Sequence, residues 1–115
     1  MISACTMITN PFTFDYPVYE ACYNALQFAK QLVIVDGADD PTECNQLVAS
    51  LRGPYRDAKI KIVRNFWDPD NPLMEVEQRN LMLKSCNESW IAPFDADEIF
   101  HENDNGVFRG TDQIK

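Results

Sequence analysis

Acidic side chains gather where an apolar run ends in the last third of the chain. Asp95, Asp97 and Glu98 closely follow the run from Trp90 to Phe94. Carboxylates repel one another, and each is unfavourable beside a core unless a cation compensates its charge. Oxygen ligands of this kind suit Mg²⁺ or Mn²⁺, which commonly keep water and substrate phosphates as their remaining ligands. The pattern therefore predicts a divalent metal site on Asp95 and Asp97, and a polar strand end that turns into solvent is the alternative.

Asp36 occupies a similar place after an earlier apolar run. The run from Leu32 to Val35 is continuous, as expected of a strand that is buried on both faces. Asp36 and Gly37 follow it directly, and the Asp-Gly pair is also a favoured turn sequence. Asp36 is therefore a candidate ligand-binding residue, with a simple turn role as the alternative.

The elements that would position these acids alternate along the sequence. Apolar segments predict strands at residues 2–9, 32–35, 59–63 and 90–94, and apolar residues at helical spacing predict helices over residues 17–29, 40–53 and 75–86. Asp40 suits the cap of the second helix, and Pro41 suits its first turn. Repeated β-α units favour a mostly parallel sheet with right-handed crossovers and helices on both faces. We therefore expect an α/β fold, a three-layer α/β/α sandwich, formed by a single domain over residues 1–115.

The expected fold would bring the acids together. In such sheets, ligands collect beyond the carboxyl ends of the strands. Asp36 follows the second predicted strand, and Asp95 and Asp97 follow the fourth. We therefore expect all three carboxylates at one edge of the sheet.

Composition limits the classes of partner. The formal net charge is −8, from 18 acidic and 10 basic residues. Nonspecific binding to a nucleic-acid backbone needs a basic face, so nucleic acid is not an expected partner. A small anionic ligand remains compatible with this charge if a bound metal inverts the charge locally.

The cysteines and the apolar segments indicate the compartment. The four cysteines are scattered without a C-x-x-C pair, which indicates reduced, mostly buried thiols rather than zinc ligands or disulfides; they are Cys5, Cys22, Cys44 and Cys86. No segment approaches the ~20 apolar residues of a transmembrane helix, and the first residues lack the features of a signal peptide. These observations predict a cytoplasmic protein.

Three motifs in order resemble the family-2 glycosyltransferases. The stretch from Glu77 to Phe100, EQRNLMLKSCNESWIAPFDADEIF, looks like their signature, in which an Arg-Asn pair opens a helix and a later apolar strand ends in D-x-D. The stretch LVIVDGADDPT, residues 32–42, is similar to their second-strand motif, and residues 2–10 match their first unit. The resemblance covers residues 2–100 and implies the Rossmann-like nucleotide-binding half of a GT-A fold.

The resemblance also implies roles for the acids. Asp97 would ligate the Mn²⁺ or Mg²⁺ ion that holds the diphosphate of a nucleotide-sugar. Asp95 would face the ribose or the sugar and contribute to the metal shell. Asp36 would accept a hydrogen bond from the base or the ribose. The metal would then neutralise the nucleoside diphosphate as it leaves the sugar, which is a Lewis-acid role.

Two further roles that the resemblance implies have simple structural alternatives. Thr9 would lie beside the base, or it is a turn residue before Asn10 and Pro11. Arg79 would lie near the phosphates, where its planar fork suits oxyanions. Alternatively, Arg79 pairs with Glu75 one helical turn away.

The sequence departs from the family pattern in two places. Pro93 lies inside the last predicted strand, where a central strand would lose a ladder hydrogen bond. Only 18 residues follow Asp97, whereas the family places its acceptor-binding half and its catalytic base further downstream. No residue of this chain matches that base, so the catalytic residue is unassigned.

These features predict a nucleotide-sugar-binding half that transfers a sugar to an acceptor hydroxyl only in a complete enzyme. The acceptor would be a glycan, a lipid or a protein. A non-catalytic nucleotide-sugar-binding module is the alternative, and a phosphatase of the haloacid-dehalogenase type is disfavoured because that family needs further motifs downstream of its aspartates. Apolar surface left uncovered by a missing acceptor half would favour self-association.

Overall fold

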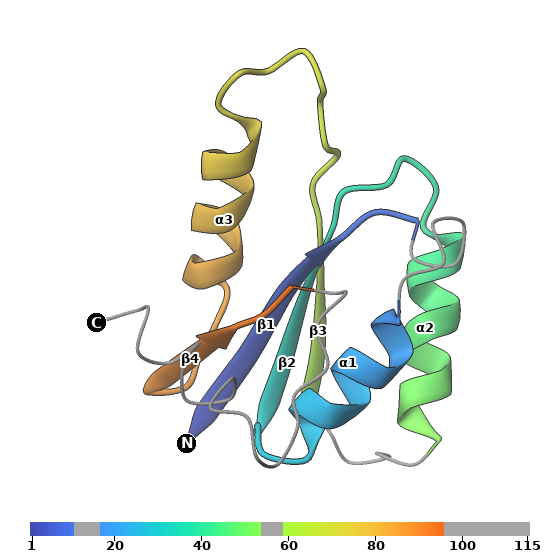
Figure 1. Cartoon of the computed structure of the whole chain (residues 1–115), viewed down its shortest axis with the longest axis vertical. Coiled ribbons are helices and arrows are strands. Elements are labelled where there is room, and N and C mark those ends of the chain that lie inside the picture. The colour runs from blue at the N-terminus through green and yellow to red at the C-terminus, as the bar shows by residue number, and fades with distance from the viewer. Residues whose placement is uncertain (11–16, 54–58, 96–115) are drawn as a thin grey trace.

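The computed structural model describes residues 1–10, 17–53 and 59–95 of the chain. Strands and helices alternate through this part, as Figure 1 shows. The elements are β1 (Ile2–Ile8), α1 (Val18–Leu26), β2 (Gln31–Asp36), α2 (Thr42–Arg52), β3 (Lys59–Arg64), α3 (Met74–Lys84) and β4 (Trp90–Pro93). The predicted order of strands and helices is confirmed. None of the described helices is long and apolar enough to cross a membrane.

The strands form one parallel sheet in the order β3-β2-β1-β4, so the fold is of the α/β, Rossmann-like class. Every residue of β2 is buried, as its uninterrupted apolar run predicts for a strand inside the sheet. Because all strands run in one direction, the residues that follow them meet at one edge, at the top of Figure 1. We call this edge the carboxyl edge.

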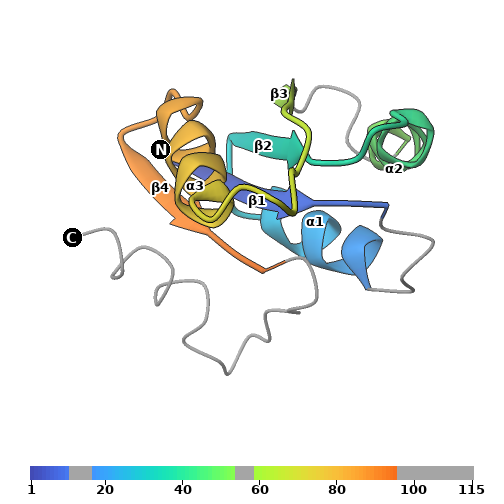
Figure 2. The same ribbon diagram turned by 90° about the horizontal axis from the view of Figure 1, so that it is seen from above.

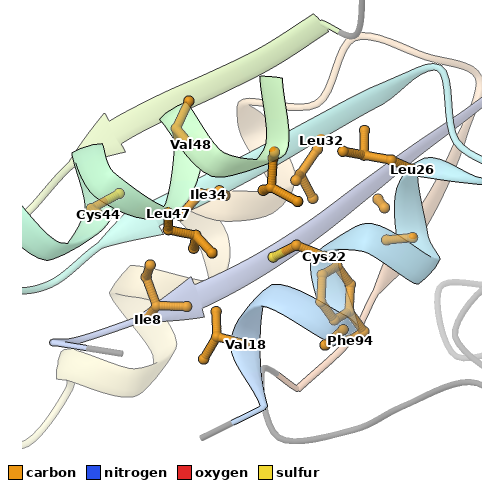
Figure 3. Packing of buried hydrophobic residues seen from close by; sticks show 14 residues of the cluster. Ile8, Val18, Cys22, Leu26, Leu32, Ile34, Cys44, Leu47, Val48 and Phe94 are labelled. Atoms are coloured by element: carbon orange, nitrogen blue, oxygen red, sulfur yellow. The ribbon is translucent and has the colours of Figure 1, made fainter. Parts of the chain in front are cut away.

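Helices cover both faces of the sheet. Figure 2 shows α1 and α2 on one face and α3 on the other, which gives the three layers that the sequence predicts. Successive strand residues point to opposite faces, so Ala4 and Ile34 pack on the α1/α2 side whereas Cys5 and Val33 pack on the α3 side. The larger apolar cluster lies on the α1/α2 side, where Phe94 joins the residues of α1 and α2 (Figure 3).

The described helices are slightly shorter than predicted at their ends. α1 ends at Leu26, three residues before the end expected from the apolar pattern. α3 ends at Lys84 rather than at Cys86, because the Ser85 hydroxyl donates to a carbonyl one turn earlier at 2.7 Å and Ser85 caps the helix. Cys86 therefore lies in the segment after the helix.

The start of α2 lies one residue later than predicted, so Pro41 and not Asp40 is the N-cap residue, although Asp40 still binds the first residue of the helix. The helix begins at Thr42, and Asp40 Oδ1 accepts hydrogen bonds from the Thr42 amide at 3.0 Å and the Thr42 hydroxyl at 2.6 Å. These bonds hold the pKa of Asp40 below its ordinary value. A side chain near the start of the helix thus satisfies an amide that lacks an intrahelical partner.

β4 accommodates Pro93 because it lies at the edge of the sheet within the described part of the chain. Pro93 is opposite Cys5 of β1, and the next amide, that of Phe94, donates to the Cys5 carbonyl at 3.0 Å. Successive amides of a strand point to opposite sides, so the proline nitrogen faces away from β1. The proline removes no ladder hydrogen bond to β1.

Candidate functional site

Three of the predicted site residues in the described part of the chain lie at or just beyond the carboxyl ends of strands. Thr9 follows β1, Asp36 ends β2, and Asp95 lies two residues beyond β4. β1 runs between β2 and β4, with Ile8 opposite Asp36 and Cys5 opposite Pro93. β2 and β4 are therefore separated by two strand spacings, about 10 Å.

Asp36 is the most unusual residue of this edge. Its side chain is 1% exposed, and its Oδ1 atom accepts a hydrogen bond from the Ala38 amide at 3.0 Å. Its Oδ2 atom has no hydrogen-bond partner among the described residues. An unpaired buried polar atom costs about 1–3 kcal/mol, and more when it is charged. Oδ2 is thus an acceptor that a ligand donor would satisfy.

Two neighbouring side chains set the electrostatics around this carboxylate. Arg64 Nη1 lies 3.6 Å from Asp36 Oδ2, and Arg64 Nη2 donates to the carbonyls of Ala38 and Asp39 at 2.9 and 3.1 Å. Arg64 therefore fixes the loop after β2 while it partly compensates the buried charge. The Asp36 carboxylate also acts on the thiol of Cys44 on α2. Burial, assisted by the Asp36 charge, raises the pKa of Cys44 to about 12.

Gly37 marks a point of close packing between the ends of β1, β2 and β3. A Cβ atom at this position would lie 2.9 Å from Thr9 Oγ1, 3.0 Å from Trp67 Cβ and 3.4 Å from Gln78 Nε2. The Gly37 backbone is held on both sides, since its amide donates to the Ile8 carbonyl and its carbonyl accepts from the Trp67 amide, each at 2.8 Å. Only a residue without a side chain fits here.

Gln78 is not among the predicted site residues, although it lies beside Gly37 at the carboxyl edge. The apolar stripe of α3 is interrupted at Gln78, and in the structure this side chain is fully buried. Its Oε1 atom accepts from Asn65 Nδ2 at 2.6 Å, and its Nε2 atom donates to the Asn65 carbonyl at 2.9 Å. The two bonds fix the segment after β3 to α3. The interruption of the stripe is the signal that marks Gln78 for a polar partner.

Arg79 does not lie in this buried group. It is exposed on α3, and its Nη2 atom lies 3.5 Å from Glu75 Oε1, so the i,i+4 pairing is present. The pair is half to two-thirds exposed, and such pairs contribute little to stability. The Arg79 guanidinium therefore remains accessible to an anion.

Of the two residues predicted to bind a metal, only Asp95 lies in the described part of the chain. Asp95 is exposed, and the described residues contain no group of three or more potential metal ligands. Asp97 lies outside the described residues. Mg²⁺ commonly binds through one or two carboxylates and completes its shell with water and substrate phosphates, so an exposed strand-end carboxylate fits this chemistry.

The cysteines are free thiols, as the sequence indicates. Three of them are buried and Cys86 is partly exposed.

Comparison with known proteins does not assign this chain to a family. No model of a protein family matches the sequence, and no curated protein matches it.

Proposed function

We propose that this chain binds a nucleoside-diphosphate sugar at the carboxyl edge with the help of a divalent cation. In this proposal it is the donor half of a glycosyltransferase that passes the sugar to an acceptor hydroxyl. The single observation that carries the proposal is the Oδ2 atom of the buried Asp36 side chain, which has an ion-pair partner in Arg64 but no hydrogen-bond partner among the described residues. The position of Asp36 at the end of a central parallel strand is where α/β sheets bind ligands.

Asp36 would accept a hydrogen bond from an N–H or O–H group of the base or the ribose. The Asp36 side chain is 1% exposed. Binding therefore requires either that this side chain turns outward, away from Arg64, or that the residues around it move apart. A hydrogen bond to a charged acceptor contributes about 1.5–3 kcal/mol. An outward turn would break the 3.6 Å ion pair with Arg64 and the Ala38 bond to Oδ1, but no hydrogen bond to Oδ2 among the described residues.

The close packing at Gly37 supports a platform for the base. Thr9 Oγ1 and Trp67 Cβ crowd the space beside Gly37, and the Gln78–Asn65 bonds hold the third side. Such a surface is fixed before the ligand arrives, so little further ordering is needed on binding. Thr9 is in this interpretation a polar contact for the base as well as a packing residue.

The diphosphate would lie toward β4. Asp95 and Asp97 would hold Mn²⁺ or Mg²⁺, and the ion would supply Lewis-acid neutralisation of the diphosphate. Arg79, whose guanidinium is half exposed, is available to the same oxyanions. The excess of acidic residues in the chain makes a cation necessary for binding a polyanion here.

Titration calorimetry of nucleoside diphosphates in the presence of Mn²⁺ tests the proposal. Asp36→Asn keeps an acceptor for the Ala38 amide but removes the charge, and affinity should fall about 10- to 100-fold. Asp39→Asn is the matched control, since this neighbouring carboxylate is exposed, and its affinity should stay within about twofold of the unmodified chain. Equal affinities of the two variants would refute the role of Asp36.

An assay of nucleotide-sugar turnover separates an enzyme from a binding module. Slow release of nucleoside diphosphate from a nucleotide-sugar, dependent on Mn²⁺, would indicate that part of the transfer machinery is present. Tight binding without release would indicate the non-catalytic module.

A further inference from the structure

We propose that Cys5 and Cys86 form an oxidisable thiol pair, in which Cys86 reacts first with a peroxide and Cys5 then closes an intramolecular disulfide. The proposal does not depend on the nucleotide site. The pair lies on the α3 face of the sheet, where Cys5 is part of the apolar cluster and Cys86 packs against it.

The backbone positions hold the two cysteines next to each other. The segment after α3 crosses the start of β1, since the Glu88 amide donates to Ser3 Oγ at 3.1 Å. Ser3 and Cys5 are two residues apart on one strand, so both side chains point to this face. Cys86 precedes Glu88 by two residues and packs against the apolar cluster that contains Cys5, and its thiol donates to the Met82 carbonyl at 3.5 Å.

The surroundings make Cys86 the more nucleophilic of the two thiols. Cys86 is partly exposed, and Lys61 Nζ donates to the carbonyl of the preceding residue, Ser85, at 3.3 Å. The hydrogen bond from Cys5, aided by the Lys61 charge, lowers the pKa of Cys86. The same hydrogen bond is the largest cause that raises the pKa of Cys5, and burial is the second. The charge of Arg79 lowers this pKa, but its effect is the smallest. The thiolate is the reactive form of cysteine, so the first attack falls to Cys86.

The other two cysteines provide an internal comparison on the opposite face. Cys22 of α1 and Cys44 of α2 both belong to the α1/α2 cluster (Figure 3), and both are buried. Burial is the main cause that raises the pKa of each to about 12, and Cys44 adds to the effect on Cys22. Because both thiols are buried and their pKa values are raised, they should resist the oxidant that modifies Cys86.

The reaction balances with hydrogen peroxide as the oxidant. The Cys86 thiolate attacks one peroxide oxygen, the O–O bond breaks, and the other oxygen leaves as hydroxide and takes up a proton to become water. Cys5 then loses its proton and attacks the Cys86 sulfur, and the S–O bond of the sulfenic acid breaks with release of a second water. Two thiols are oxidised by two electrons in total, and one peroxide is reduced to two waters.

Peptide mapping by mass spectrometry after brief peroxide treatment of the folded chain tests this inference. We expect a loss of two hydrogen atoms and a disulfide-linked peptide pair that contains Cys5 and Cys86, with Cys22 and Cys44 still alkylated by iodoacetamide after unfolding. The Cys22→Ala variant is the matched control and should form the same disulfide. Circular dichroism confirms that each variant is folded before it is treated.

Single variants distinguish the two steps. Cys5→Ala should leave Cys86 as a sulfenic acid that dimedone traps, whereas Cys86→Ser should abolish oxidation at Cys5. Lys61→Gln should slow the alkylation of Cys86 at neutral pH. A disulfide between Cys22 and Cys44, a disulfide between two chains, or no modification of Cys86 under conditions that leave the protein folded would overturn the proposal.

Discussion

The substitution Gly37→Ala tests the packing at the carboxyl edge most sharply. The added Cβ atom would lie 2.9 Å from Thr9 Oγ1, closer than real Cβ atoms essentially ever come, and 3.0 Å from Trp67 Cβ, which is tighter than most real contacts. The Gly37 amide and carbonyl are each bound at 2.8 Å to backbone atoms, so the loop cannot move aside without losing a hydrogen bond. We therefore expect overpacking to destabilise the protein.

The magnitude follows from comparable substitutions. An extra methyl group in a tightly packed site costs about 1–3 kcal/mol. For a chain of this length, 1 kcal/mol corresponds to about 4 °C in the melting temperature, so Tm should fall by about 4–12 °C. The double variant Gly37→Ala/Thr9→Ala lacks the contact with Thr9 Oγ1 and keeps the one with Trp67 Cβ. Its Tm should therefore lie above that of Gly37→Ala alone.

Gly53→Ala is the matched control for this experiment. Neither glycine has a positive φ, so backbone conformation does not distinguish them. At Gly53 the new Cβ atom would meet, among the described residues, the Ser50 carbonyl alone, at 3.3 Å, and Gly53 lies in helical conformation at the end of α2. Its Tm should change little. If urea and thermal unfolding show Gly37→Ala to be as stable as Gly53→Ala, the account of this edge is wrong.

Three other predictions concern the polar contacts around the site. Gln78→Ala removes the partners of the Asn65 side-chain amide and backbone carbonyl and opens a cavity. The free energy of unfolding in urea should therefore fall by about 2–4 kcal/mol. Gln46→Ala, on the exposed face of α2, should cost under about 1 kcal/mol. Asp97→Ala should abolish Mn²⁺-dependent nucleotide binding in calorimetry with little change in Tm; unchanged binding would contradict the metal assignment. Asp40 has its pKa lowered below 3.8 by bonds from Thr42, so its contribution to stability is present above pH 3.8 and is lost as pH falls through the lower folded-state pKa. The difference in urea midpoint between the unmodified chain and Asp40→Ala should therefore shrink in acid, and a difference that stays constant down to pH 2 would count against this contact.

The fold could be predicted because the local patterns are consistent with one another. The apolar run before Asp36 has the length and continuity of a strand buried on both faces, and β2 is buried throughout. The acids were expected at one edge because parallel strands end together, and the described residues Asp36 and Asp95 do lie at or just beyond the carboxyl ends of β2 and β4. Helix ends were less predictable because Ser85 caps α3 with its own hydroxyl.

The contacts within the site could not be predicted because they join distant residues. Nothing near Gln78 in the sequence indicates that Asn65 is its partner, and the two residues meet only because α3 packs back on the sheet. Likewise, a glycine after Asp36 predicts a turn. The close packing around Gly37 could not be predicted, because it depends on Thr9 and Trp67, which are distant in the sequence. The neighbourhood of Cys5 and Cys86 depends in the same way on the segment that crosses β1.

The thermal stability of the unmodified chain with nucleotide-sugars, measured with and without Mn²⁺, tests the central claim most directly. At a ligand concentration of about 100 times Kd, binding adds about 2.7 kcal/mol, which corresponds to a rise in Tm of about 10 °C for this chain. We expect this rise for at least one nucleoside-diphosphate sugar only when Mn²⁺ is also present. A panel in which no nucleotide raises Tm beyond the effect of Mn²⁺ alone would contradict the proposed function.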